Sequence, residues 1–356
     1  MNDASRRFLE TLLDTPGPSG FETGPARVWR AEAGGFADRV GADVGGNSLA
    51  TINPDASPRI MFAAHIDEIG LMVVHIDDDG YVHFEPIGGW DHQVFVGQRV
   101  VLLGREGPIA GVIGKPAIHV QEKEDREKVS KASDLWIDIG AANRSDAEAR
   151  LRVGDAGVLA STVQGLPNGR IVSRSLDNRI GAFVVLEALR LLAADRPTAS
   201  VTAVATTQEE IAHATGGGAR TTAVGLDAQV AVVVDVTHAT DYPGADKKRH
   251  GDVKLGGGVV LSRGSAINPV VFERLAAAAD REAIPYGIQA APKATGTDAD
   301  AIYTAHRGIA TGLVSVPNRY MHSPNEMVAV EDLDRASRLL AAFARAVEPG
   351  TDFVPR

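Results

Sequence analysis

Histidine and carboxylate side chains recur where apolar stretches of this chain end. Five short segments carry them: 64–68 (AHIDE), 175–179 (SLDNR), 207–210 (TQEE), 233–237 (VVDVT) and 319–324 (RYMHSP). Imidazole and carboxylate groups are common ligands of divalent metal ions, and a water on such an ion is acidified toward neutral pH. The segments therefore indicate metal-assisted hydrolysis.

A two-metal site accounts for the ligand-type residues together. His65, Asp177 and Asp235 would hold one ion, and Asp177, Glu210 and His322 would hold the other. With Asp177 shared, each ion has one imidazole and two carboxylates, which leaves positions open for water and substrate.

Two acidic residues remain outside this ligand set. Glu209 has no ligand duty and can act as the general base, which takes a proton from the attacking water and returns it to the leaving amine. Asp67 lies two residues after His65 in an extended segment, so both side chains point the same way. A carboxylate there would accept the second ring N–H of His65 and orient the ring.

Each motif also has a simpler structural explanation. His65 and Asp67 could be a surface pair, Asp177 could cap a helix, and Asp235 could cap a loop. The Glu209–Glu210 pair could lie in a solvated loop, and His322 could be a structural histidine. Only the co-occurrence of all five motifs at strand ends or helix starts favours the metal site.

Two periodicities alternate in the outer parts of the chain and predict the elements that carry these residues. Continuous apolar runs predict buried strands at 59–64, 200–206, 229–234 and 312–316. Amphipathic spacing predicts helices at 4–13, 22–33, 178–194, 269–283 and 331–347. This alternation predicts an α/β sandwich, in which functional side chains gather at the carboxyl ends of the strands.

The middle of the chain has a different pattern. From about residue 71 to 163, short strand-like runs are separated by Gly and Asp turns, and a charged loop interrupts them at 121–133. Hairpin spacing without helices predicts a small β-barrel or sandwich. We therefore expect a catalytic domain at 1–69 and 166–356, with a β-rich domain inserted at 70–165.

Composition excludes several classes of protein. The 356 residues include 0 Cys, which excludes disulfide scaffolds, thiolate metal sites and cysteine nucleophiles. The net charge of −10 argues against nucleic acid as a partner. The sequence shows neither a signal-peptide pattern nor a membrane-spanning run, so we expect a cytoplasmic protein without a membrane partner.

The motifs resemble those of the tetrahedral (TET) dinuclear metalloaminopeptidases, which include glutamyl, leucyl and lysyl aminopeptidases. The matching segments span nearly the whole chain: PGPSGFE at 16–22, DVGGNSLA at 43–50, AHIDEIGLMV at 64–73, GQRV at 97–100, GVIGKPAIH at 111–119, DLWIDIGA at 134–141, SLDNRIG at 175–181, TTQEEI at 206–211, DVT at 235–237, GTDA at 296–299 and NRYMHSPNEMV at 318–328.

The resemblance implies a three-layer α/β sandwich of the zinc-exopeptidase type, with a mixed, mainly parallel sheet and an inserted barrel-like dimerisation domain. It implies two divalent ions per subunit, zinc first and cobalt or manganese as alternatives. It also implies short peptide substrates and dimers that assemble into a tetrahedral dodecamer. The family roles agree with those assigned above for His65, Asp67, Asp177, Glu209, Glu210, Asp235 and His322.

Two segments depart from the family pattern. The segment 211–219 is longer and contains His213 and three consecutive glycines, and the segment after Asp235 adds His238 and Asp241. We expect His213 not to be a ligand, because a third ligand beside Glu210 would close the position that the substrate needs. The longer segment would instead shape selectivity at the rim of the pocket.

Three rival functions stay open at this stage. A deacylase or carboxypeptidase-like amidohydrolase would use the same ions and would need a cation, such as Arg179 or Arg319, for a substrate carboxylate. A glycoside hydrolase would need only two carboxylates and leaves the histidines unexplained. A non-catalytic assembly protein would have lost site residues, and none is missing.

Overall fold

The computed structural model describes residues 1–212 and 215–356. The α-helices within these ranges are α1 (Asp3–Asp14), α2 (Thr23–Ala33), α3 (Arg144–Arg150), α4 (Leu176–Ala194), α5 (Gly217–Leu226), α6 (Lys247–His250), α7 (Pro269–Arg281), α8 (Asp298–Ile302) and α9 (Val330–Arg345). The strands are β1 (Arg39–Ala42), β2 (Ser48–Ile52), β3 (Arg59–His65), β4 (Gly70–Ile76), β5 (Val82–Ile87), β6 (Arg99–Gly104), β7 (Gly107–Gly114), β8 (Trp136–Asp138), β9 (Ala156–Leu159), β10 (Gln164–Leu166), β11 (Arg170–Ser173), β12 (Ser200–Thr206), β13 (Val230–His238), β14 (Val259–Gly264), β15 (Tyr286–Ala291), β16 (Ala310–Asn318) and β17 (Glu326–Ala329).

An eight-stranded mixed sheet forms the centre of the larger part of the molecule. Its strand order is β1-β2-β12-β3-β13-β16-β14-β15, and β12, β3, β13 and β16 run parallel to one another. These four strands are almost entirely buried, which explains their continuous apolar sequences. Parallel strands end at the same edge of the sheet, so the segments that follow them are brought together there.

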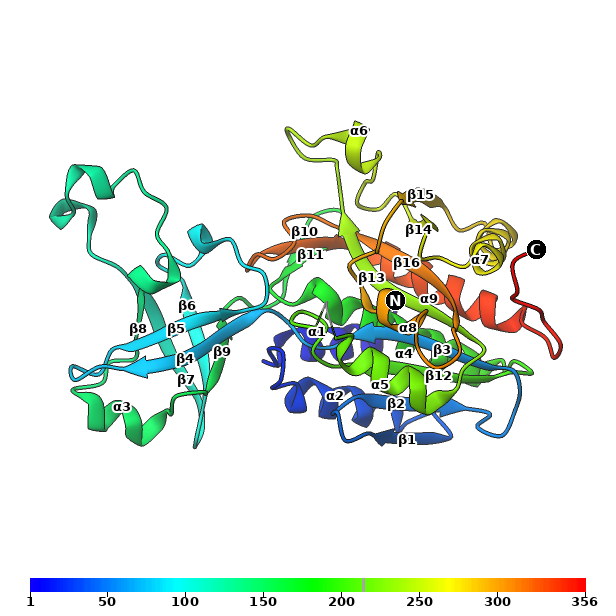
Figure 1. Cartoon of the computed structure of the whole chain (residues 1–356), viewed down its shortest axis with the longest axis horizontal. Coiled ribbons are helices and arrows are strands. Elements are labelled where there is room, and N and C mark those ends of the chain that lie inside the picture. The colour runs from blue at the N-terminus through cyan, green and yellow to red at the C-terminus, as the bar shows by residue number, and fades with distance from the viewer. Residues whose placement is uncertain (213–214) are drawn as a thin grey trace.

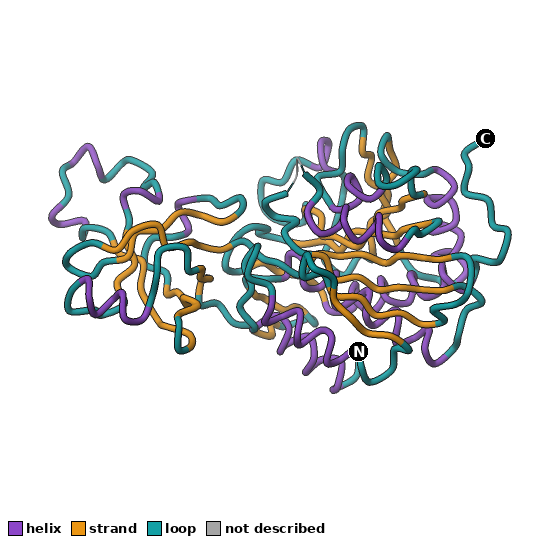
Figure 2. The backbone as a smooth tube through the Cα atoms, turned by 60° about the horizontal axis from the view of Figure 1, so that its bottom comes forward, coloured by secondary structure: helices purple, strands orange, loops and turns teal. Residues whose placement is uncertain are grey.

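Helices cover both faces of this sheet (Figures 1 and 2). α4 packs on β12, β3 and β13 and against α9, while α5 and α8 pack together on the opposite face. A continuous apolar core of both layers includes Phe62, Phe183, Val232 and Leu340. The predicted α/β sandwich with a mainly parallel sheet is therefore confirmed.

A closed barrel of six strands, in the order β4-β5-β8-β7-β6-β9, lies at one end of the sheet (Figure 1). It has its own apolar core, which includes Leu71, Phe84, Phe95 and Ile137. The barrel begins at Gly70, a few residues after β3 ends at His65, so it stands beside the edge where the parallel strands end. The expected barrel-like fold of the middle segment is confirmed.

The structure corrects several local expectations. The middle segment is not free of helices, because α3 (Arg144–Arg150) begins at an Asn143 cap and packs against β4. The three glycines of the 211–219 segment are not all loop, since α5 begins at Gly217. β13 extends to His238, four residues beyond the predicted strand end.

A small antiparallel sheet of β10, β11 and β17 lies between the sandwich and the barrel. Among the described residues, no helix combines the length and the apolarity needed to cross a lipid bilayer.

Candidate metal centre

A cavity of about 580 Å³ opens over the carboxyl ends of the parallel strands. Its lining includes every predicted ligand, namely His65, Asp177, Glu210, Asp235 and His322, together with Glu209. His65 is the last residue of β3, and Asp235 lies near the end of β13. The structure thus brings together side chains that the sequence scatters over more than 250 residues.

The first group of ligand-type side chains is His65, Asp177 and Asp235. Their ligand atoms all lie within 4.8 Å of one another, and all three side chains are buried. His65 Nε2 is 3.2 Å from Asp177 Oδ1 and 3.9 Å from Asp235 Oδ1. This is the trio that the sequence assigned to one ion.

The second group is Asp177, Glu210 and His322. His322 Nε2 lies 3.4 Å from Asp177 Oδ2 and 3.3 Å from Glu210 Oε2. Asp177 therefore presents one carboxylate oxygen to each histidine, as a bridging ligand would. Unlike the other members, the His322 side chain is about one-third exposed, so this group lies on the solvent side.

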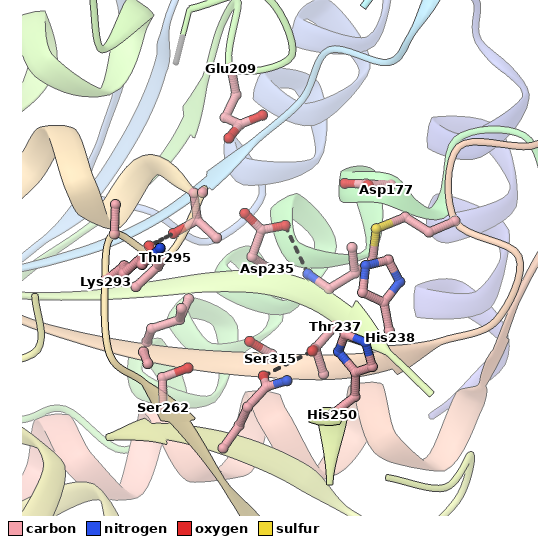
Figure 3. A pocket seen from close by; sticks show the side chains of 18 of the residues that line it. Asp177, Glu209, Asp235, Thr237, His238, His250, Ser262, Lys293, Thr295 and Ser315 are labelled. Atoms are coloured by element: carbon pink, nitrogen blue, oxygen red, sulfur yellow. Dashed lines mark hydrogen bonds between the residues drawn. The ribbon is translucent and has the colours of Figure 1, made fainter. Parts of the chain in front are cut away.

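Glu209 also lies close to the first group, about as near to His65 Nε2 as Asp235 does. Its Oε2 atom is 3.8 Å from His65 Nε2, and His65, Glu209 and Glu210 form a third possible ligand group. Figure 3 shows Glu209 apart from Asp235 and Asp177, on the other side of the open space. This position suits a base that faces the ligands.

Asp67 supports both the imidazole and the turn that carries the two glutamates. His65 Nδ1 is 3.4 Å from Asp67 Oδ1 and 3.3 Å from the Asp67 carbonyl oxygen. The backbone N–H groups of Glu209 and Glu210 each donate to the Asp67 carboxylate over 3.2 Å, and the Ser19 hydroxyl also donates to it. A single buried carboxylate thus holds the His65 ring and the backbone of the Glu209–Glu210 turn in place.

The turn that carries Glu209 and Glu210 and the turn that carries His322 each contain a non-glycine residue in the left-handed backbone region. Gln208 has φ of 61°, and its N–H donates to Glu22 Oε1 over 3.1 Å. His322 has φ of 59°, and its N–H donates to Glu326 Oε1 over 2.9 Å. Residues with this strained conformation persist where surrounding contacts hold them, commonly at functional sites.

Glu326 holds both ends of the second group. Its other oxygen, Oε2, accepts the Asp177 N–H over 2.8 Å, so one buried carboxylate ties the start of α4 to the His322 turn. Burial, together with the Asp177 charge, raises the pKa of Glu326 well above its usual range.

The pKa values of the cluster indicate that the described residues do not fully neutralise its buried negative charge. Burial, with Asp235, Asp298 and Glu210 nearby, raises the pKa of Glu209 to about 10. Burial and Asp177 raise the pKa of Asp235 well above its usual range and raise that of Glu210. Burial alone would lower the pKa values of the two histidines, but the surrounding carboxylates outweigh it and raise that of His322 to about 11.

One buried carboxylate oxygen of this cluster lacks a hydrogen-bond partner among the described residues. Glu210 Oε1 is shielded from solvent and forms no hydrogen bond in that part of the chain. An unpaired carboxylate oxygen beside other buried acids is unfavourable unless a cation neutralises it. The donor set, the spacing and this oxygen therefore fit divalent metal ions.

The simpler explanations of the motifs mostly fail. His65, Asp67, Glu209 and Glu210 are buried, so they are neither a surface pair nor a solvated loop. Asp177 does not cap α4, because Asn178 Oδ1 accepts the Gly181 N–H instead. Asp235 does not cap a loop either, because it lies inside β13, where its carboxylate accepts the N–H of the next residue, Val236.

Sequence reasoning gave no role to Glu22, Asp298 and Glu326, all of which are buried at the site. Asp298 accepts a hydrogen bond from Thr206 and helps to raise the pKa of Glu209. Each of the three lies in one of the motifs quoted above. The available signal was an acidic residue within such a motif.

The residues of the two departing segments have different positions. His213 lies outside the described residues. His238 lines the cavity and faces His250, with 6.1 Å between ring centroids. Asp241 instead accepts two hydrogen bonds of 2.7 Å from Arg319.

The two arginines that the sequence offered to the carboxypeptidase-like alternative, Arg179 and Arg319, are engaged elsewhere. Besides the Arg319–Asp241 pair, Arg179 is fully buried and bonded to Glu68 over 2.8 Å. In the part of the chain that the structure describes, neither arginine lines the cavity.

A buried histidine–carboxylate cluster at the ends of parallel strands defines a metal-dependent hydrolase. Comparisons with known proteins agree. The model of the M42 glutamyl aminopeptidase family matches residues 46–339. The lysyl aminopeptidase of Pyrococcus furiosus is 33% identical over 352 residues, which cover 98% of this chain and 99% of that protein.

Solved structures give the same result. A TET aminopeptidase from a marine sediment archaeon of the Thaumarchaeota superposes with a TM-score of 0.92 at 32% identity and covers 98% and 97% of the two chains. The TET1 peptidase of Pyrococcus horikoshii, which can assemble into a tetrahedron or a large octahedral shell, superposes with a TM-score of 0.85 at 28% identity, covering 96% and 100%. This chain belongs to the M42 aminopeptidase family and is a metal-dependent aminopeptidase.

Proposed function

We propose that this aminopeptidase releases N-terminal residues from short peptides with two divalent ions. His65, Asp177 and Asp235 would hold one ion, and Asp177, Glu210 and His322 the other. The division of the two Asp177 oxygens between the two histidines is the observation that carries the proposal. Zinc is the ion expected first from the ligand types, with cobalt or manganese as alternatives.

The bound ions would lower the pKa of a coordinated water and polarise the scissile carbonyl. Glu209 takes the proton of the attacking water and delivers it to the leaving amine. Asp67 fixes the positions of the His65 ring and the Glu209 backbone through hydrogen bonds. Glu326 fixes the backbones of Asp177 and His322 in the same way. The concentration of carboxylates at this end of the cavity favours the cationic α-amine of a peptide, which would restrict cleavage to the N-terminus.

The test is hydrolysis of a panel of aminoacyl-p-nitroanilides by protein freed of metal with a chelator and then reloaded with Zn²⁺, Co²⁺ or Mn²⁺. We expect activity to return at two equivalents of metal and to be absent on N-acetylated substrates. Activity that prefers the acetylated substrates would support the deacylase alternative instead. Family membership supports the aminopeptidase over the glycoside hydrolase and the non-catalytic assembly protein.

Self-association through the barrel is the second part of the proposal. The assembly of the Pyrococcus horikoshii TET1 peptidase supports it, as does the exposure of apolar side chains on and beside the barrel, among them Val112, Ile118 and Val120. We propose that residues 70–165 act as the dimerisation unit, from which a tetrahedral dodecamer is built. Light scattering tests this, since a monodisperse monomer would refute it. The cytoplasmic location remains a prediction.

A further inference from the structure

The cavity is much larger than the metal cluster, and its other end has a different character. Away from the cluster, it extends over the last strands of the sheet, where β13, β16, β14 and β15 lie side by side. All four strands place polar side chains in the lining, among them Thr237, Ser315, Ser262 and Gln289. Figure 3 shows Thr237, Ser315 and Ser262 on this side of the pocket, away from Glu209 and Asp177. The floor beside the reaction centre is therefore partly polar rather than a purely hydrocarbon surface.

The amide of Gln289 is oriented toward donation. The Thr237 hydroxyl donates to Gln289 Oε1 over 2.9 Å, which uses the acceptor of the amide and leaves its NH₂ group facing other partners. Ser262 and Ser315 are 4% and 2% exposed, and neither hydroxyl has a hydrogen bond to a described residue. Strands β14, β15 and β16 thus each offer a hydrogen-bond donor to a molecule bound in the cavity.

Two permanent cations, Lys293 and Arg249, also line the cavity. Lys293 follows β15, and Arg249 belongs to α6. Within residues 1–212 and 215–356, neither side chain forms an ion pair, although the chain carries a net charge of −10. All four acids in the lining, Asp177, Glu209, Glu210 and Asp235, belong to the metal cluster. Figure 3 shows Lys293 across the pocket from His238 and His250, with the polar floor between them.

We infer that this end of the cavity is a subsite for a carboxylate of the substrate, bound by Lys293 and Arg249 over the donors of Gln289, Ser262 and Ser315. The inference rests on the proposed function, because binding of the α-amine and the scissile bond at the metal end places the rest of the peptide at this end of the cavity. The carboxylate is that of an N-terminal Asp or Glu side chain, or the C-terminal carboxylate of a very short peptide. A lysine side chain finds no acid here outside the metal cluster, so the subsite disfavours it.

The first arm of the test compares kcat/KM for Glu-, Leu- and Lys-p-nitroanilides with wild-type and Lys293→Met protein. We expect the Glu-to-Leu ratio to fall about tenfold in Lys293→Met, since a hydrogen bond to a charged group is lost while the length of the side chain is kept. Lys293→Arg keeps the charge and should retain most of the ratio. Lys254→Met removes a surface lysine that pairs with Asp252 and should not change it.

The second arm distinguishes the source of the carboxylate. Leu-Ala and Leu-Ala-amide differ only in the C-terminal charge. If that carboxylate occupies the subsite, Lys293→Met lowers the rate on Leu-Ala relative to the amide and leaves the Glu-to-Leu ratio unchanged. A change in neither ratio would overturn the inference, and metal-dependent turnover of Leu-p-nitroanilide in the same assays would leave the proposed function standing.

Calorimetry provides a readout that needs no turnover. Free glutamate should bind the wild-type protein more tightly than leucine or lysine does, and this advantage should shrink about tenfold in Lys293→Met. If wild-type protein binds the three amino acids equally, or if lysine binds best, the subsite does not exist. This result holds even if the protein proves to have no aminopeptidase activity.

Discussion

The edge of the eight-stranded sheet and the barrel bury opposite kinds of side chain. At the sheet edge, carboxylates and histidines from five segments are packed together, and further buried groups such as Asp67 and Glu326 hold their backbones. The barrel interior is filled by aliphatic and aromatic side chains, including Leu71, Phe84 and Ile137. The polar cluster needs many specific hydrogen bonds from distant elements, whereas an apolar core needs volume and pattern.

The surfaces of the two regions differ as well. The cavity described above lies in the sandwich. The barrel and its loops instead expose apolar side chains, among them Val112, Ile118, Val120 and Val129. These differences support our proposal that the sandwich performs the chemistry and that the barrel is the unit of association.

One contact brings the barrel side directly against the candidate metal centre. Gly89 follows β5 of the barrel, and a methyl group placed on it would lie 3.2 Å from His322 Nδ1. A substitution at Gly89 can therefore test whether the barrel side influences the metal centre. The predictions below run from the largest expected effect to the smallest.

Glu209→Gln should abolish most turnover without emptying the site. Because the substitution removes only the group that moves the proton, we expect a loss of about 10²–10⁴-fold in kcat, the usual contribution of a general base. Elemental analysis should still find two ions. A half-empty protein would mean that Glu209 is a ligand, as the third possible ligand group would allow.

Glu210→Gln is the matched variant of the adjacent residue. It should lose one metal equivalent, because Glu210 completes the group with Asp177 and His322 and an amide oxygen is a weaker ligand than a carboxylate. Elemental analysis after extensive dialysis measures this. Full metal content in Glu210→Gln, with loss in Glu209→Gln, would exchange the roles of the two residues.

Metal binding should release protons and become tighter as pH rises. The pKa of His322 is raised to about 11 in the metal-free protein and that of His65 well above its usual value, because buried carboxylates surround both rings, so both rings hold protons near neutral pH and must give them up to act as ligands. Apparent affinity should rise about tenfold per pH unit for each proton released. Titration calorimetry between pH 6 and 8, in buffers of different ionisation enthalpy, counts the protons. Affinity that is flat across this range would contradict the expected protonation.

Gly89→Ala should transmit a small disturbance from the barrel side to the metal centre. The new methyl group presses on the His322 ring, which must shift by a few tenths of an ångström. We expect kcat to fall by roughly twofold to tenfold, since small misplacements near reacting groups are costly. Gly225→Ala, where no described atom lies within 4 Å of the new methyl group, is the control. Equal rates in both variants would mean that the barrel side does not constrain the site.

Val112→Asp should weaken self-association and leave the chemistry of each subunit nearly unchanged. Val112 lies on β7 with 48% of its surface exposed, so a charge there opposes burial between subunits without disturbing the barrel core. Light scattering should report smaller particles, while metal content stays at the wild-type value. Val44→Asp, on the fully exposed side chain of a sandwich loop, is the control. Assemblies of equal size in both variants would place the interface elsewhere.

Much of this architecture is determined by local sequence pattern. Continuous apolar runs identified β3, β12, β13 and β16, and the short runs of the middle segment identified the barrel strands, because side-chain burial has a clear period in each. The short helices α3 and α5 were missed, since neither a seven-residue stretch with five polar side chains nor a segment that begins with a glycine run gives a clear apolar period. His65, Glu209, Glu210, Asp235 and His322 were found because charged groups that end apolar runs are rare.

Tertiary structure alone decided how those groups are held. The sequence could not show that Asp67 accepts the N–H groups of Glu209 and Glu210, or that Glu326 joins Asp177 to His322. Asp67 lies more than 140 residues before both glutamates, and Glu326 lies 149 residues after Asp177. Nor could the sequence reveal that Lys293 and Arg249 line the same cavity as the acids, while Arg179 and Arg319 are engaged elsewhere. Residue types establish which chemistry is possible, and the order of strands in the sheet establishes which charges face one another, because only the fold sets their distances.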